Sequence, residues 1–146
     1  MMNRIILWLI VVMFPCLPQL ASPAAAQTRP LTAAEVTRIV ADRTFMMTYT
    51  SEKRENHHIY FGRDGRYTLL FPEGKVRSSD TWKVETNDNF CLRRALRSGG
   101  DTRYITKCGP VTLAGPNTLN LHDDEGKQIY TLQFLGNGNL LDQFAK

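Results

Sequence analysis

The chain has 146 residues, of which 42% are hydrophobic and 22% charged, and its formal net charge at pH 7 is +4. This length excludes an assembly of several ordinary domains. So mild a positive charge is common for solubility alone, although it also suits anionic lipid, polysaccharide or an acidic protein as a partner.

The N-terminal segment is typical of a secretory signal peptide. Arg4 supplies a positive charge, Ile5 to Phe14 form an unbroken apolar run, and the small residues Ala24 to Ala26 offer a cleavage site. The apolar run is far shorter than the roughly 20 residues that a membrane-spanning helix needs. We therefore expect residues 1–26 to be removed, with no transmembrane segment left and a periplasmic or secreted location. An uncleaved membrane anchor is the alternative.

Removal of the signal peptide leaves 146 − 26 = 120 residues, which fits a single domain over residues 27–146. Arg4 is the only charged residue lost, so the formal charge becomes 17 − 14 = +3. Export argues against nucleic acid as the physiological partner. The mature chain keeps Cys91 and Cys108, and an even cysteine count in a small exported domain predicts a disulfide. A catalytic thiol is the alternative, but no His lies near either Cys in the sequence.

A helix is predicted in "LTAAEVTRIVAD", Leu31 to Asp42. Thr32 is the expected N-cap, and Glu35 stands three positions later, as a capping box requires. Leu31 and Val36 occupy the positions of a hydrophobic staple. We expect one short amphipathic helix that packs on a sheet or closes an open end.

From Phe45 onward the hydrophobic period changes to two, and short aromatic or β-branched runs alternate with turn residues. This pattern predicts an all-β fold, a small antiparallel β-barrel of about eight strands with the short N-terminal helix. A β-sandwich is the alternative. The expected strands are Thr44 to Thr50, Asn56 to Phe61, Arg66 to Phe71, Ser79 to Thr86, Phe90 to Leu96, Arg103 to Cys108, Val111 to Leu113, Thr118 to His122, Lys127 to Leu135 and a terminal Leu140 to Phe144.

The register of one hairpin follows from its loop. If Arg63 to Gly65 form a three-residue loop with Gly65 left-handed, the apolar residues on both sides share one face. A two-residue turn would instead place Arg63 opposite Arg66, which is unfavourable. The expected pairs are therefore Phe61 with Tyr67, Ile59 with Leu69, and His57 with Phe71.

Two further runs predict inward side chains. In "DTWKVETNDNFC", Trp82 and Val84 alternate with polar residues, so Trp82 should face the core. In "KQIYTLQFLGNGN", one face holds Tyr130, Leu132 and Phe134, and the other holds Ile129, Thr131, Gln133 and Leu135. This second run is therefore expected to be a central strand.

Residues with catalytic or metal-binding chemistry are sparse. His57 and His58 are adjacent, so on a strand they point to opposite faces and do not readily share a metal ion. His122 and the acidic residues after it fit a solvated turn. The sequence contains no nucleophile elbow, phosphate loop or zinc-protease motif. We expect no enzymatic activity, no metal and no cofactor.

Basic residues are the stronger indication of a binding role. Arg93, Arg94 and Arg97 lie close together. Strand alternation sends Arg93 and Arg94 to opposite faces, so at most one of them points into a barrel. The alternative is a solvated hairpin end whose charges discourage edge pairing.

The stretches "YFGRDGRY", "DTWKVETNDNFC" and "TKCGPV" resemble a pattern of small exported bacterial β-barrel proteins of unknown function. Those proteins are lipocalin-like or avidin-like in outline. The resemblance spans Phe45 to Val111 and implies a β-barrel in the periplasm, with no binding residue carried over.

These observations lead to one functional hypothesis and one alternative. The first is a non-enzymatic binding or envelope-associated protein for a small apolar or amphipathic ligand. Its candidate ligand-binding residues are Trp82, Tyr67, Phe61, Tyr130 and Arg94. The alternative is a protein-interaction module, such as an inhibitor of a cell-wall hydrolase. Inward aromatic residues fit both a cavity and a filled core, and small barrels are often filled by side chains.

Overall fold

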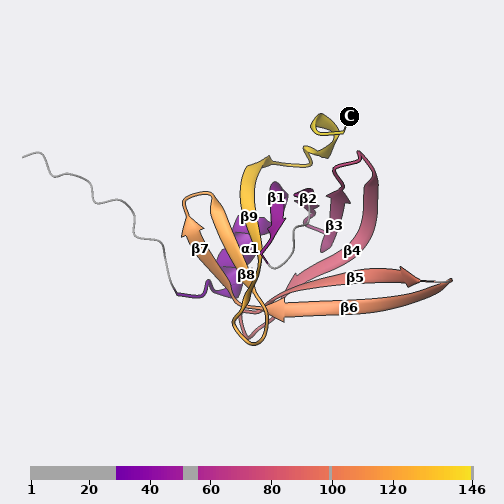
Figure 1. The fold of residues 1–146 in the computed structure, drawn as a ribbon. Coiled ribbons are helices and arrows are strands. Elements are labelled where there is room, and N and C mark those ends of the chain that lie inside the picture. The colour runs from indigo at the N-terminus through magenta and orange to yellow at the C-terminus, as the bar shows by residue number, and fades with distance from the viewer. Residues whose placement is uncertain (1–28, 51–55, 99, 146) are drawn as a thin grey trace, which may run out of the picture.

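The computed structural model describes residues 29–50, 56–98 and 100–145. The predicted signal peptide lies outside the described residues. The described chain forms one antiparallel nine-stranded sheet that curls into a half-barrel (Figure 1). This confirms the predicted all-β, barrel-like class with one short helix. The elements are α1 (Ala33–Val40), β1 (Arg43–Tyr49), β2 (His57–Phe61), β3 (Arg66–Leu70), β4 (Val76–Val84), β5 (Phe90–Ser98), β6 (Asp101–Gly109), β7 (Val111–Gly115), β8 (Thr118–His122), β9 (Gln128–Asn137) and a 3-10 turn η1 (Leu141–Gln143).

The strand order is β6-β5-β4-β3-β2-β1-β9-β8-β7. Two meanders, β1 to β6 and β7 to β9, are therefore joined by the ladder between β1 and β9. In a closed up-and-down barrel, β6 and β7 would be neighbours. Here these two strands are the edges of the sheet, and the barrel is open between them. We call this opening the seam.

The seam exists because β6 and β7 are joined by Pro110 alone. The shortest common hairpin loop has about two residues, so a single residue turns a corner instead of pairing the two strands. The corner is tightly packed. A Cβ on Gly109 would clash with the His122 carbonyl, and His122 N donates to the Pro110 carbonyl at 3.0 Å.

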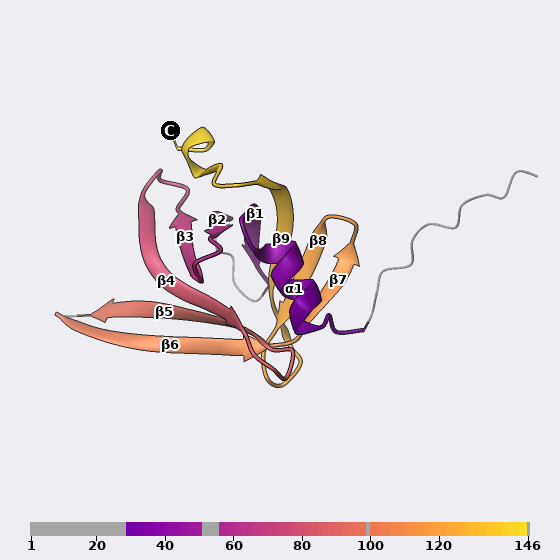
Figure 2. The same cartoon turned by 180° about the vertical axis from the view of Figure 1, so that it is seen from behind.

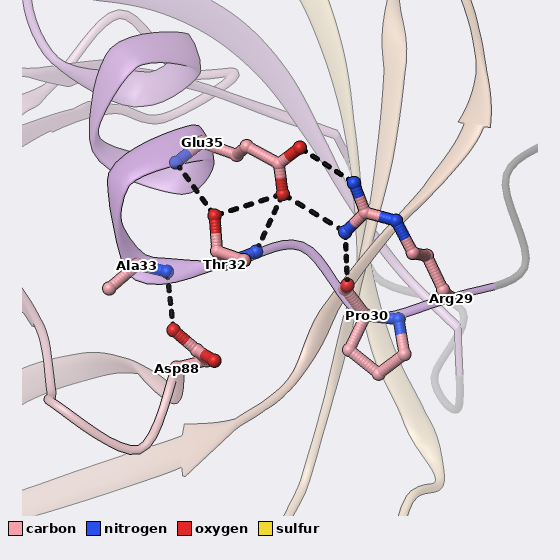
Figure 3. Close-up of polar contacts among 6 residues, drawn as sticks. All are labelled: Arg29, Pro30, Thr32, Ala33, Glu35 and Asp88. Carbon is pink, nitrogen blue, oxygen red and sulfur yellow. Dashed lines mark hydrogen bonds and ion pairs between the residues drawn. The ribbon is translucent and has the colours of Figure 1, made fainter.

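The N-terminal segment covers the β7 side of the seam. Pro30 forms a β-bridge with Thr112, and Leu31 N donates to Val111 O at 2.8 Å. Helix α1 then begins at the predicted capping box, which is present in full between Thr32 and Glu35 (Figure 3). No helix within the described ranges is long and apolar enough to cross a membrane.

Helix α1 also reaches the other meander. The N–H of Ala33 donates to Asp88 Oδ1 at 2.6 Å, and Asp88 lies in the β4–β5 turn (Figure 3). Arg29 pairs with Glu35 at 2.7 Å on the outer side of the helix start. The inner side of the helix buries Val36 and Val40 in the core. The helix therefore spans the seam and joins the end of β4 and β5 to β7.

The core lies on the concave face of the sheet. Phe61 forms edge-to-face contacts with Phe45, Trp82 and Phe90, with centroids 5.7 to 5.9 Å apart. The inward position predicted for Trp82 is confirmed, and its indole Nε1 donates to the Gly62 carbonyl at 2.9 Å. The central position predicted for the strand now called β9 is also confirmed, because it pairs with both β1 and β8.

The predicted hairpin register is confirmed for two of its three pairs. Phe61 is opposite Tyr67 and Ile59 is opposite Leu69. Gly65 has the expected positive φ of 77°, which completes the three-residue loop. His57 and Phe71 lie beyond the paired residues of this ladder, but their rings meet with centroids 4.7 Å apart.

The predicted terminal strand from Leu140 to Phe144 is wrong. The segment forms the turn η1, in which Leu141 is buried and Phe144 N donates to Leu141 O at 3.0 Å. Asn139 favours this turn because its side chain accepts from Leu141 N at 3.1 Å, a local bond that competes with strand pairing. Phe144 then stacks on His58 of β2, with centroids 4.2 Å apart.

Strands β5 and β6 form a long hairpin that extends away from the rest of the sheet (Figures 1 and 2). We call this hairpin the arm. A disulfide between Cys91 and Cys108 joins its two strands close to the body, at a Cα–Cα distance of 4.1 Å. The predicted cysteine pairing is therefore present in the structure.

Candidate ligand cleft

A cleft lies between the arm and the body of the half-barrel, on the concave face. The arm contributes side chains from β5 and β6, and the body contributes side chains from β1, β2, β3 and β9. The residues that line it are Met47, Tyr49, Ile59, Tyr67, Leu69, Leu92, Arg94, Ile105, Lys107 and Tyr130. We call this feature the cleft. β4 bends along its length, and β5 and β6 extend away from the other strands (Figure 1).

The free volume of the cleft is about 30 Å³. A water molecule needs roughly 10–15 Å³ by this measure, so the space holds one or two waters or a group of similar size. The cleft therefore accepts a small polar group between its walls, while any larger part of a ligand must lie at the opening.

The candidate residues predicted from the sequence separate into two groups. Tyr67, Tyr130 and Arg94 line the cleft. Trp82 and Phe61 do not; they lie in the aromatic cluster of the core and are 7% and 0% exposed. Trp82 thus serves the fold, because its ring fills the core and its N–H is bound to the Gly62 carbonyl.

Arg94 is one of the two cations that line the cleft; the other is Lys107. Strand alternation places Arg93 on the convex face, where its guanidinium lies 4.0 Å from the Tyr104 ring centroid, and Arg94 on the concave face. The expectation that these two neighbours diverge is confirmed. The Nε of Arg94 is buried, and no residue in the described part of the chain accepts its hydrogen bond. A buried donor without an acceptor is unfavourable, and more so when it belongs to a charged group.

Three phenols face the same space. Tyr49 and Tyr130 are in edge-to-face contact with centroids 5.1 Å apart. The Tyr67 hydroxyl donates to the Arg93 carbonyl at 3.2 Å. Burial raises the pKa of Tyr67, and the nearby Asp80 carboxylate raises it further, while Arg94 acts in the opposite direction. Tyr67 therefore stays protonated at neutral pH and keeps the proton that it donates to the Arg93 carbonyl.

Asp80 fixes the position of the arm beside these phenols. It is opposite Tyr67 in the β3–β4 ladder, and its Oδ1 accepts from the backbone N–H of Ala95 at 2.9 Å. This bond crosses from β4 to the segment just after Arg94. The carboxylate thereby holds the part of β5 that carries the Arg94 side chain.

Sequence reasoning missed Lys107 and Ile105 as cleft residues. Both lie on β6, where Ile105 is directly opposite Arg94 and Lys107 is opposite Leu92. The signal was present in the disulfide, because a Cys91–Cys108 bridge between facing positions sets the register of the whole hairpin. That register places Arg94, Ile105 and Lys107 on one face.

A second hollow, of about 100 Å³, lies at the other end of the concave face beside α1. Ile39 of the helix, Phe134 of β9 and Asn117 of the β7–β8 turn are among its lining residues. Arg43 covers the Phe134 ring at 5.3 Å from its centroid. Its cation is thus already engaged with an aromatic face.

One trio of metal-type donor atoms lies together within the described residues. Glu85, Cys91 and Cys108 have donor atoms within 4.8 Å of one another. Both sulfurs form the disulfide, so neither is a thiolate that could bind a metal ion. His57 and His58 point to opposite faces of β2, as their adjacency predicts, with His57 buried and His58 stacked on Phe144.

Comparison of the chain with family models, with curated proteins and with solved structures gave no match.

Proposed function

We propose that the protein is a non-enzymatic, exported binding protein that holds a small amphipathic ligand in the cleft. The observation that carries the proposal is the buried Nε of Arg94. This nitrogen belongs to a charged group, and none of the described residues accepts its hydrogen bond. An oxygen of the ligand, placed between Arg94 and the phenols, would satisfy that donor. Hydrogen bonds to charged groups are among the stronger ones in proteins.

The rest of the cleft suits the apolar part of such a ligand. Met47, Ile59 and Leu69 come from the body, and Leu92 and Ile105 come from the arm. An apolar lining with a few placed polar groups is the usual composition of a small-molecule site. The free volume of about 30 Å³ admits the polar end, so the apolar part lies along the opening.

A binding role agrees better with the chemistry of the cleft than a catalytic one. A general base or nucleophile needs a pKa close to the working pH. Burial moves the pKa of Tyr67 away from neutrality, so this phenol donates a hydrogen bond and does not accept a proton.

Export is supported by the disulfide, which forms and persists in oxidising compartments. The predicted signal peptide and its cleavage after Ala26 support the same conclusion. N-terminal sequencing of the protein recovered from the periplasm or the medium should begin at Gln27. A chain that keeps residues 1–26 in a membrane fraction would contradict this part of the proposal.

The ligand proposal is tested by titrating the protein with two matched probes, octanoate and octan-1-ol, observed by ¹⁵N NMR. The Arg94 Nε–H signal should shift with octanoate, together with the amide signals of cleft residues. Arg94→Gln should weaken binding by about tenfold or more, because a hydrogen bond to a charged group contributes about 1.5–3 kcal/mol. Arg93→Gln is the control, since Arg93 lies on the convex face.

Two results would contradict the proposal. One is the absence of any shift in cleft residues with either probe up to the probe's solubility limit. The other is equal weakening by Arg93→Gln and Arg94→Gln, which would place binding elsewhere. If neither probe binds and a purified cell-wall hydrolase is inhibited instead, the alternative of a protein-interaction module replaces the carrier function.

A further inference from the structure

The structure shows which residues of β6 point their backbone N–H and C=O groups towards the free edge of the sheet. In an antiparallel pair, residues that exchange no hydrogen bonds lie about 4.5 Å apart at Cα, and bonded residues about 5.5 Å apart. Cys91 and Cys108 are directly opposite each other at 4.1 Å, so they form a non-bonded pair. The backbone N–H and C=O of Cys108 therefore point away from β5.

The same phase continues along the whole strand, because the β5–β6 ladder has no register shift. The backbone groups of Thr102, Tyr104 and Thr106 consequently point to the outer edge of the sheet. β6 pairs with no strand other than β5 in the described part of the chain. The opposite edge differs, since the segment at Pro30 and Leu31 already bonds to β7.

The arm exposes the side chains along this edge. From Asp101 to Lys107 every residue is exposed except Ile105, which is partly buried. Tyr104 is 58% exposed, the largest exposed fraction among the big hydrophobic side chains that the structure describes. Figures 1 and 2 show the strand extending beyond the body, so the body does not cover its outer edge. An unblocked edge strand is a template for pairing with another chain.

We propose that β6 pairs antiparallel with β6 of a second copy of this chain, with Tyr104 opposite its own counterpart on the two-fold axis. In this register Thr102 is opposite Thr106, so the outward backbone groups of Thr102, Tyr104 and Thr106 form hydrogen-bonded pairs. Asp101 of each copy is then opposite Lys107 of the other copy, which gives two pairs of opposite charge.

Charge pairing favours this register over the registers that are shifted by two residues. Moving the pairing by two residues in one direction places Arg103 opposite the Arg103 of the second copy. Moving it in the other direction places Arg103 opposite Lys107. Both arrangements oppose like charges, which destabilises an antiparallel pair, whereas the Asp101 to Lys107 register is self-complementary. The partner is therefore a second copy of this chain, because a single strand carries both halves of the charge pattern.

The test is the molecular mass of the protein, produced from its full sequence, by sedimentation equilibrium and light scattering over a concentration series. The wild type should show a concentration-dependent dimer. Asp101→Lys and Lys107→Asp should each raise the dimer dissociation constant about tenfold or more, because each replaces two attractive pairs by two repulsive ones. The double variant, which restores opposite charges, should dimerise again.

Two controls separate this register from general effects. Lys127→Asp makes the same charge change at the exposed β8–β9 turn and should leave the dimer unchanged. Thr106→Pro removes an outward N–H but no bond to β5, so it should weaken the dimer while the circular dichroism of the sheet is kept. A wild type that stays monomeric at millimolar concentration would overturn the proposal. A dimer equally stable in both single charge variants, or unaffected by Thr106→Pro, would also overturn it.

Discussion

The carboxylate of Asp88 accepts the N–H of Ala33 at 2.6 Å, a bond between residues 55 positions apart in the chain. Ala33 is the first residue of α1, where backbone donors have no partner within the helix. A negative charge at this end is also favoured by the helix dipole. The β4–β5 turn thus caps helix α1, and Leu31 just before this helix is bonded to β7 on the other side of the seam.

Removal of this cap should loosen α1 from the half-barrel. Asp88→Gly, which tolerates the positive φ of 66° at this position, should lower the free energy of unfolding by about 1 kcal/mol in urea denaturation. Asp88→Asn keeps an acceptor oxygen and also tolerates this backbone conformation, so its loss should be smaller. Equal losses for the two variants would show that the hydrogen bond to Ala33 is not the stabilising element.

The corner at Gly109 should tolerate no side chain. Gly109→Ala would place its Cβ against the His122 carbonyl, so the backbone must move, at a cost of about 2 kcal/mol or more. Gly115→Ala is the matched control, because a Cβ there meets no atom within 4 Å. Thermal unfolding of both variants checks this prediction. A Gly109→Ala protein as stable as Gly115→Ala would contradict the packing described at the corner.

Trp82 should contribute more to stability than its volume alone implies. Trp82→Phe removes the donor to the Gly62 carbonyl and leaves that buried oxygen without its partner, so the loss should be about 2 kcal/mol or more. Phe90→Leu trims the same aromatic cluster without breaking a hydrogen bond. Chemical denaturation should therefore show the larger loss for Trp82→Phe, and the reverse order would contradict the role given to the hydrogen bond.

Acid should weaken the start of the helix in a defined pH range. The hydrogen bond from Arg29, together with those from Thr32, lowers the pKa of Glu35 from 4.5 to about 2. Its stabilising contribution is therefore complete above about pH 4.5 and is lost as the pH falls towards 2. Denaturation curves should show a smaller advantage of wild type over Glu35→Gln at pH 2 than at pH 6. Arg29→Ala should move the pKa of Glu35, measured by NMR, back towards its usual value.

The disulfide should stabilise the arm, because it joins facing positions of β5 and β6. Replacing both cysteines by Ala should lower the free energy of unfolding by about 3 kcal/mol in the chain-entropy account, and reductant should have a comparable effect on the wild type. Intact mass before and after reduction should differ by two hydrogens. Free thiols in the protein recovered after export would contradict the pairing of Cys91 with Cys108.

Local features of the structure were accessible from the sequence. The capping box at Thr32 and Glu35 and the three-residue loop ending at Gly65 depend on neighbouring residues only, so a pattern of a few positions was sufficient. Strand alternation likewise placed Trp82 inward and separated Arg93 from Arg94. These are the features for which local chemistry and the final fold agree.

Features that depend on distant segments were not accessible. The seam results from the single residue Pro110 between β6 and β7, and the strand pattern of the sequence does not show whether these two strands pair. The division of the aromatic residues between core and cleft depends on how far β4 bends, which no local pattern reports. Trp82, Phe61 and Tyr67 all belong to the buried core cluster, but of the three only Tyr67 also lines the cleft.

The strand order has a consequence for the folding pathway. Every ladder joins strands that follow one another in the chain, except that between β1 and β9, whose pairs include Arg43 with Asn137. The meanders can each form through short loops, whereas the β1–β9 ladder must close a long one, at a greater entropic cost. Because non-local pairing slows folding, we expect the pairing of β1 with β9, which joins the two meanders, to be the slow step. The strands on both sides of the seam belong to meanders that have already formed by then.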